Sequence, residues 1–202
     1  MRALVLQHDH NAPAGLLGDL LAGRGEVVTV RMDRGERPPD PAGFDRLVTL
    51  GSEQAADDDA VAWQADERAA LAAADAAGVP ILGVCFGAQS LARALGGAVR
   101  RAARPELGWV RVGTRAPETV EDGPWFAWHD DELIPPPGAE ILAANSSGVQ
   151  AYRAGAHTGV QFHPEVTAEI VAAWDPPDRA LLAPGQPYDA ARAFALFDAL
   201  VA

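Results

Sequence analysis

Lysine is absent from this chain of 202 residues, and all sixteen basic residues are arginine. Chemistry that depends on a lysine amine, such as the phosphate-binding Walker loop or a Schiff base with a carbonyl substrate, is therefore excluded. Acidic residues outnumber basic ones, 28 to 16, which gives a formal net charge of −12. Because nucleic-acid binding needs clustered positive charge, we expect no nucleic-acid partner.

Cysteine occurs once, as Cys85. A single thiol forms no disulfide within the chain and cannot build a zinc site of four thiolates. His8, His10 and His157 show no ligand spacing and are interpreted as surface or packing residues. We therefore expect no metal and no cofactor, and Cys85 either packs in the core or takes part in chemistry.

Long hydrophobic runs are also lacking. No apolar stretch approaches the roughly 18 residues that cross a bilayer. The N-terminus enters a short apolar segment without the longer run and cleavage site of a signal peptide. Hydrophobic residues make up 49% of the sequence, which is ordinary for a globular protein with a sizeable core. We expect a soluble cytoplasmic protein with no membrane partner, folded as a single domain over residues 1–202.

Short apolar runs alternate with Ala- and Leu-rich segments in the first half, a pattern typical of βαβ units around a parallel sheet. The apolar run over residues 79–84 predicts a central strand buried on both faces. Beyond residue 109 the pattern changes to strands that either extend the sheet or form a smaller antiparallel layer. The predicted strands are residues 2–7, 27–32, 44–50, 79–84, 109–112, 125–129, 140–144, 149–153 and 158–162; the predicted helices are residues 15–22, 60–77, 88–95 and 188–200, with an irregular connection over residues 175–186.

Cys85 lies between the central strand and the next predicted helix, in the segment Gly83-Val84-Cys85-Phe86-Gly87. Glycines two positions before and after it permit a sharp, strained turn that lifts the middle side chain clear of the backbone, as in a nucleophile elbow. At the N-terminus of a helix, the positive end of the dipole favours a thiolate. Most free cysteines, however, are small buried hydrophobic residues, and this segment alone leaves both interpretations open.

A histidine and a glutamate follow the last predicted strand, in the segment His163-Pro164-Glu165. Pro164 disfavours helix for His163 and keeps the segment extended, so Glu165 projects to the same side as the imidazole. A thiol needs a neighbouring imidazole to stabilise its thiolate and to return a proton to a leaving amine, while a carboxylate holds the imidazole tautomer. The tripeptide alone is weak evidence for a catalytic site, and it gains weight only in combination with the nucleophile elbow at Cys85.

Taken together, the two segments resemble the class I glutamine amidotransferase family. Residues 80–92 resemble its nucleophile motif, residues 160–166 resemble its His/Glu motif, and their order and separation also match. The resemblance continues over residues 105–109, 128–130 and 149–153, and it is closest to stand-alone members similar to the amidotransferase domain of GMP synthase. It implies a flavodoxin-like α/β fold: a three-layer sandwich with a mainly parallel central sheet and a small antiparallel extension.

The resemblance also implies roles for individual residues. Cys85, His163 and Glu165 would form a catalytic triad, and the backbone N–H groups of Phe86 and of the Gly51-Ser52 turn would form the oxyanion hole. Substrate contacts would come from four further side chains, those of Gln89, His129, Asn145 and Ser146. For Gln89 a solvated helix position, and for His129 a structural role, are the alternatives.

One loop departs from the family pattern. Many relatives carry Gly-Gly-Pro after the third strand, whereas this chain has Gly51-Ser52-Glu53-Gln54. Loss of the second glycine and the proline alters the loop backbone and places a carboxylate near the expected site. The rate and the choice of substrate are therefore the properties that this departure affects, since the triad is intact.

The leading functional hypothesis is hydrolysis of glutamine to glutamate and ammonia through a γ-glutamyl thioester on Cys85. Ammonia from this family normally passes to an ATP-dependent synthetase, and because the resemblance covers nearly the whole chain, we expect that partner to be separate or absent. The first alternative is a partner-independent hydrolase or transferase of γ-glutamyl amides or peptides. The second is a non-catalytic regulatory subunit, for which the altered Gly51-Ser52-Glu53 loop is the motive.

Overall fold

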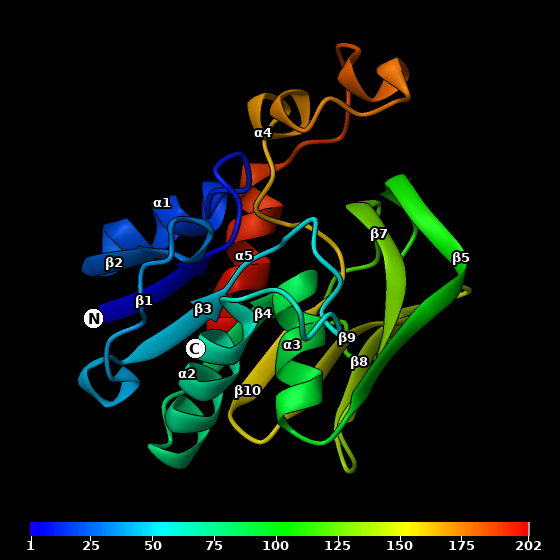
Figure 1. Ribbon diagram of the computed structural model, residues 1–202. Helices are drawn as coiled ribbons and strands as arrows, with labels where there is room; N and C mark the ends of the chain where they lie inside the picture. The colour runs from blue at the N-terminus through cyan, green and yellow to red at the C-terminus, as the bar shows by residue number, and fades with distance from the viewer. Residues whose placement is uncertain (202) are drawn as a thin grey trace.

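The computed structural model describes residues 1–201, which form a central sheet of eight strands with helices on both faces (Figure 1). The strand order is β2-β1-β3-β4-β10-β9-β8-β6. Neighbouring strands from β2 to β10 pair in parallel, and those from β10 to β6 pair antiparallel. The predicted three-layer α/β sandwich with a mainly parallel sheet and an antiparallel extension is confirmed.

The strands of the parallel part are β1 (Arg2–Gln7), β2 (Glu26–Arg31), β3 (Arg46–Thr49), β4 (Ile81–Val84) and β10 (His157–Val160). The antiparallel extension consists of β6 (Gly113–Thr114), β8 (Glu140–Asn145) and β9 (Gly148–Ala154). The helices are α1 (Gly15–Arg24), α2 (Gln64–Ala76), α3 (Phe86–Ala94), α4 (Ala168–Ala173) and α5 (Ala190–Val201), with the short 3-10 helices η1 (Met32–Arg34), η2 (Pro41–Gly43) and η3 (Arg179–Leu182).

A second sheet of two antiparallel strands, β5 (Ala98–Val110) and β7 (Trp125–Ile134), stands beside the central sheet. Figure 1 shows these long strands extending along the side of the molecule opposite α1. Both possibilities left open for the second half are therefore realised, because β8, β9 and β10 extend the central sheet while β5 and β7 form a separate layer.

Alternation of side chains along the strands divides the core in two. In β1, Ala3 and Val5 pack into the cluster that contains residues of α1 and α5, such as Leu17 and Phe197. Leu4 and Leu6 pack into the other cluster, with residues of α2 and α3 such as Leu71. Since successive strand side chains point to opposite faces, an apolar run without alternation must be covered on both sides. This explains why the central strands read as continuous apolar segments.

Some boundaries differ from the predicted ones. Strand β5 begins at Ala98 rather than at residue 109, and its register with β7 shifts between Arg101 and Glu106, around Pro105. Its Arg- and Ala-rich sequence lacks strand propensity, so pairing with β7 determines its conformation. Helix α2 begins at Gln64 rather than at residue 60. Helix α4 was not predicted, and the predicted irregular connection contains the short helix η3.

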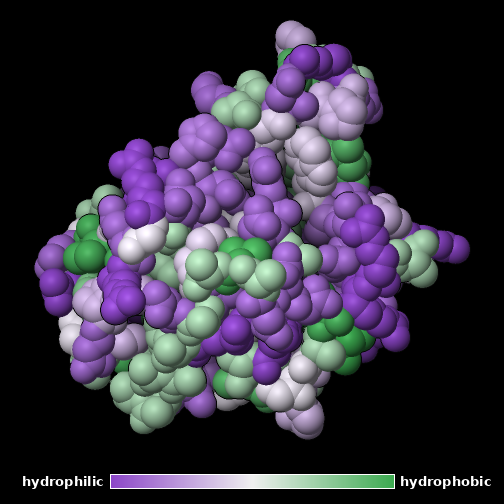
Figure 2. Space-filling view, viewed as in Figure 1, coloured by the Kyte–Doolittle hydropathy of each residue, from purple (hydrophilic) through white to green (hydrophobic). Residues whose placement is uncertain are grey.

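The surface is mainly hydrophilic on the face drawn in Figure 2, where hydrophobic side chains form small separate groups. Among the described residues, Met1 and Leu107 are the large hydrophobic side chains that count as exposed. Within the same part of the chain, every helix is too short or too polar to cross a membrane.

Phe197 provides a test of the packing of α5 on the sheet. Its side chain is fully buried among residues of the α1 and α5 layer, so Phe197→Ala should lower the free energy of unfolding by about 3–5 kcal/mol. Guanidinium titration followed by circular dichroism measures this change. The control Asp198→Ala removes an ion pair that is partly exposed, with Arg24, and should cost less than about 1 kcal/mol. Equal losses in the two variants would contradict the assigned core.

Candidate active site

Cys85 follows β4 directly and adopts a backbone conformation that is rare outside glycine, with φ 52° and ψ −111°. A side chain at Gly83 would place its Cβ 2.6 Å from the backbone of Gly87, and one at Gly87 would approach the carbonyl oxygen of Thr49 to 2.0 Å. Only glycine fits at these two positions. The strained turn expected around Cys85 is therefore present, and it presents the thiol at the N-terminus of α3.

His163 and Glu165 lie beyond the end of β10, the parallel neighbour of β4. The imidazole Nδ1 lies 2.7 Å from Glu165 Oε1, and both side chains are buried. Because a carboxylate accepts the hydrogen bond, Nδ1 carries the proton and Nε2 is left to face another group. The backbone N–H of His163 donates to the carbonyl oxygen of Phe126 in β7 at 2.7 Å, which fixes the segment between the two sheets.

Burial of the His163 imidazole acts to lower its pKa, because burial disfavours the charged form. The charges of Glu165 and Cys85 and hydrogen bonds to both side chains act in the opposite sense and outweigh burial. The pKa of His163 is therefore raised above its ordinary value. A charged imidazole beside a thiol favours the thiolate form of the sulfur.

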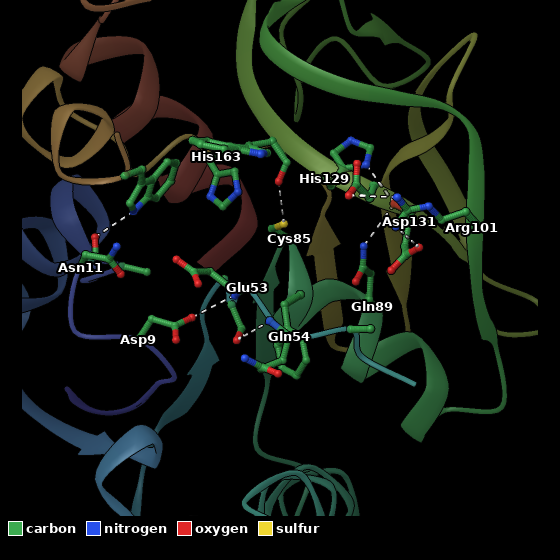
Figure 3. A pocket seen from close by; sticks show the side chains of 18 residues that line it. Asp9, Asn11, Glu53, Gln54, Cys85, Gln89, Arg101, His129, Asp131 and His163 are labelled. Atoms are coloured by element: carbon green, nitrogen blue, oxygen red, sulfur yellow. Dashed lines mark hydrogen bonds and ion pairs between the residues drawn. The ribbon is translucent and has the colours of Figure 1, made fainter. Parts of the chain in front are cut away.

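Cys85 and His163 line the same cavity, which has a volume of about 330 Å³ (Figure 3). Its lining carries four carboxylates but a single guanidinium, that of Arg101, which pairs with Asp130 at 3.1 Å. The lining residues are Asp9, Asn11, Ala12, Gly51, Ser52, Glu53, Gln54, Ala55, Cys85, Phe86, Gln89, Arg101, Trp128, His129, Asp130, Asp131, His163 and Trp174. The volume lies at the lower end of the range for small-molecule sites.

The loop after β3 lies beside the thiol. Gly51 is so close to the imidazole that an added Cβ would lie 2.9 Å from His163 Cε1 and 3.8 Å from Cys85 Cβ. Gly51, Ser52 and Phe86, the three residues expected at the oxyanion hole, all line the cavity. The loop is held by Asp9, another lining residue, which accepts a hydrogen bond from the backbone N–H of Glu53 at 3.0 Å.

Gln89 projects from α3 toward the same cavity and is almost fully buried. Its Nε2 donates to the carbonyl oxygen of Asp131 at 3.3 Å (Figure 3). The same Nε2 also donates to Gln161 Oε1 at 3.1 Å. A solvated position on the helix, the alternative interpretation of this residue, is therefore wrong. Gln161 was not singled out from the sequence, although its Nε2 lies 3.7 Å from Cys85 Sγ.

His129 lines the cavity and is held by a buried polar cluster behind it. Its Nε2 lies 3.0 Å from Glu106 and its Nδ1 lies 2.9 Å from the carbonyl oxygen of Asp131. Burial acts to raise the pKa of Glu106, but hydrogen bonds from His129, Asn145 and Gln150 outweigh burial and hold that pKa below its usual range. His129 therefore has both a structural contact and a face in the cavity.

Asn145 and Ser146 do not line this cavity, in contrast to the expected substrate contacts. The Asn145 amide is used within the protein, where it donates to Glu106 at 2.8 Å and accepts from the backbone N–H of Ser147 at 2.8 Å. Ser146 is exposed to solvent. The turn between β8 and β9 supports the wall of the cavity rather than forming it.

Several lining residues were not expected. Asp9 and Asn11 follow β1, and the carboxyl ends of parallel strands meet at one edge of a sheet, so their position after a predicted strand was a usable signal. Arg101 and Trp174 lie in segments whose structure was not predicted. Trp174 packs against the His163 ring with centroids 4.9 Å apart, a contact that no local pattern indicates.

The side chains that could bind a metal ion do not form a cluster in the described part of the chain. Among residues 1–201, the structure brings together no set of three or more His, Cys, Asp or Glu side chains placed to hold a metal ion. His8 and His157 are buried, and His157 packs by accepting a hydrogen bond from the backbone N–H of Ile81 and pairing with Asp75.

Two curated proteins show the sequence relationship. The GMP synthase (glutamine-hydrolyzing) subunit of Saccharolobus solfataricus is 40% identical over 97 residues, which cover 44% of this chain and 52% of that protein. The protein of the same name from Sulfurisphaera tokodaii is 46% identical over 96 residues, 43% of this chain and 51% of that protein. The matched region thus spans about half the length of these curated relatives.

Solved structures show the same architecture over the whole length. A glutamine amidotransferase from Methylobacillus flagellatus has 27% identity and a TM-score of 0.87, with 99% of this chain and 94% of that chain covered. One from Thermotoga maritima, at 23% identity, superposes with a TM-score of 0.89 over 100% of this chain and 96% of that one; it supports the fold alone. The family model "Glutamine amidotransferase class-I" matches residues 57–171, more than half of the chain. The chain therefore belongs to the class I glutamine amidotransferase family.

Proposed function

We propose that this protein hydrolyses the γ-carboxamide of glutamine through a covalent thioester on Cys85. The Cys85 thiolate attacks the γ-carbonyl carbon, and the carbonyl oxygen takes up the negative charge of a tetrahedral intermediate. Protonated His163 gives its proton to the γ-nitrogen, and the carbon–nitrogen bond breaks. Ammonia departs, and the γ-glutamyl group remains bound to Cys85 as a thioester. Water then gives a proton to neutral His163 and attacks the thioester, which releases glutamate and restores the thiolate.

The other residues of the site have supporting roles in this proposal. Glu165 holds the imidazole tautomer, with Nδ1 protonated and Nε2 directed to the thiol. The backbone N–H groups of Phe86 and of the Gly51-Ser52 turn would stabilise the oxyanion, since fixed donors act most strongly where charge develops. His129 would contact the substrate from the opposite wall.

A single observation carries the proposal: a strained cysteine and a histidine that is hydrogen-bonded to a buried glutamate line one small cavity. A core cysteine would need neither the positive φ nor the imidazole. Family membership supports the same reaction, and the sequence relatives are named as glutamine-hydrolysing. Apart from the substrate and water, the proposed steps use only side chains and backbone groups of this chain.

The acidic lining of the cavity favours a second candidate, the hydrolysis of γ-glutamyl amides with a positively charged leaving amine. Asp9 and Glu53 both line the cavity, and a cationic amine near them would be attracted. The chemistry at Cys85 is the same in both cases, and only the leaving group differs.

We also propose that ammonia is delivered to a separate ATP-dependent synthetase. The relatives from Saccharolobus solfataricus and Sulfurisphaera tokodaii are each named as one subunit of GMP synthase, which supports a partner of this kind. Within this chain, residues 1–202 would act as one amidotransferase domain.

Removal of the nucleophile or the base should abolish the reaction. Cys85→Ala and His163→Ala should each lower kcat for ammonia release from glutamine by about 10³-fold or more. Intact-mass analysis with a glutamine-like diazo-ketone should give one adduct in the unchanged protein and none in Cys85→Ala. An adduct that persists in Cys85→Ala would contradict the mechanism, and the absence of any adduct in the unchanged protein would favour a non-catalytic subunit.

The charge state of His163 provides a second test. Because Glu165 and Cys85 raise its pKa, the imidazole should remain protonated above the ordinary value of about 6.5. Glu165→Gln removes one of the charges that raise this pKa and should shift the titration downward. NMR titration of the labelled imidazole measures both values. The control Glu169→Gln changes an exposed carboxylate of α4 and should leave the titration unchanged; a wild-type titration at or below 6.5 would refute the expected charge state.

A panel of γ-glutamyl amides separates the two candidate substrates. We expect kcat/KM to be highest for glutamine, because the cavity is small. If Glu53 instead recognises a cationic amine, γ-glutamyl amides of diamines will be preferred, and Glu53→Gln will reduce kcat/KM for them while leaving the value for glutamine nearly unchanged. A strong preference for cationic leaving groups would overturn glutamine as the main substrate.

A further inference from the structure

Gln161 lies next to the reactive sulfur but has no part in the proposed triad. Its side chain is 1% exposed, and its Nε2 lies 3.7 Å from Cys85 Sγ. Residue 161 follows β10 directly, two positions before His163. The backbone N–H of Gln161 donates to the carbonyl oxygen of Gln150 at 2.8 Å, so the residue is held on both its main chain and its side chain.

The direction of the hydrogen bonds determines which end of the Gln161 amide faces the sulfur. The carbonyl oxygen of Asp131 can only accept, so the Gln89 atom at 3.3 Å from it must be the donor Nε2. The same Nε2 lies 3.1 Å from Gln161, which must present its acceptor Oε1 there. The remaining end of the Gln161 amide, the N–H donor, is thereby directed to Cys85.

The carbonyl oxygen that sets this direction is itself fixed. His129 Nδ1 approaches Asp131 O to 2.9 Å, and His129 Nε2 contacts the Glu106 carboxylate at 3.0 Å. Glu106 is held by further donors from Asn145 and Gln150. A series of close polar contacts therefore runs from a buried carboxylate to the sulfur, and its last part, from the Asp131 carbonyl through Gln89 and Gln161, has a defined donor and acceptor at each step.

Two other groups near the sulfur do not stabilise a thiolate throughout the proposed reaction. The carbonyl oxygen of Trp128, 3.8 Å from Cys85 Sγ, can accept from a thiol but repels a thiolate. His163 gives up its proton when ammonia leaves, so its charge varies during the proposed reaction. An amide N–H does not titrate, and its interaction with negative charge on sulfur is constant.

We infer that Gln161 is a further catalytic residue, which donates an amide N–H to the Cys85 thiolate, and that Gln89 is a positioning residue, which holds the Gln161 amide in this orientation. The inference rests on the proposed function only in taking Cys85 as the nucleophile. It also gives Gln89 a role in addition to the direct substrate contact that the family resemblance implies.

Alkylation of the protein by iodoacetamide tests this inference, because Cys85 is the only cysteine. The rate is measured by intact mass as a function of pH, and Cys85→Ala gives the background. Gln161→Met keeps the approximate shape but removes the donor, so the pH midpoint of the rate should rise by about one unit. Gln161→Glu replaces the donor by a negative charge and should raise the midpoint further.

A double-mutant cycle tests the positioning role of Gln89. As a single substitution, Gln89→Met should raise the pH midpoint of alkylation, because the Gln161 amide is then free to turn. In the Gln161→Met background the same change should have almost no effect, since there is no donor left to orient. Additive shifts would show that Gln89 acts on the sulfur independently of Gln161 and would overturn its positioning role.

Gln64→Met is the matched control, since Gln64 is a buried glutamine of α2 that donates to the Ala55 carbonyl. It should leave the midpoint unchanged, and thermal unfolding checks that each variant is folded. A midpoint unchanged in both folded Gln161 variants would overturn the inference. Alkylation requires no glutamine, so the shift can be observed even if ammonia release fails, and the two proposals can fail separately.

Discussion

The positive φ of Cys85 is the constraint on which the site depends. Close packing maintains it, because Gly83 meets the backbone of Gly87 and Gly87 meets the carbonyl of Thr49, with no room for a Cβ at either glycine. The backbone N–H of Cys85 donates to Val160 O, so β3, β4 and β10 all contribute to holding the turn. The free energy of burying these central strands offsets the local strain.

Burial has two opposite effects on the charge of the His163 imidazole. It disfavours a charged imidazole at His163, yet it also strengthens the attraction between that imidazole and the Glu165 carboxylate, because the local dielectric constant is low. The net result is a raised pKa at His163. A similar balance holds at Glu106, where several donors compensate for the loss of water and keep the carboxylate charged behind the wall of the cavity.

Sequence patterns predicted the parts of the fold that local physical chemistry controls. The strands from β1 to β4 were found from continuous apolar runs, and the turn at Cys85 was found from two glycines at fixed offsets. Strand β5 was predicted only at its end, because its Arg-rich first half owes its conformation to pairing with β7. The contacts of Gln161 and Trp174 with the site depend on the distance between elements remote in sequence, which no single segment encodes.

The two sheets contribute different parts of the cavity. Cys85, His163 and the Gly51 loop follow three adjacent strands of the central sheet, β4, β10 and β3, whereas Trp128, His129 and Asp131 belong to β7 of the small sheet. Insertions or substitutions in β5 and β7 can therefore remodel the opposite wall while the spacing of the reactive groups stays fixed. In such an arrangement, selectivity for the bound molecule can diverge over evolutionary time while the positions of the reactive groups stay the same.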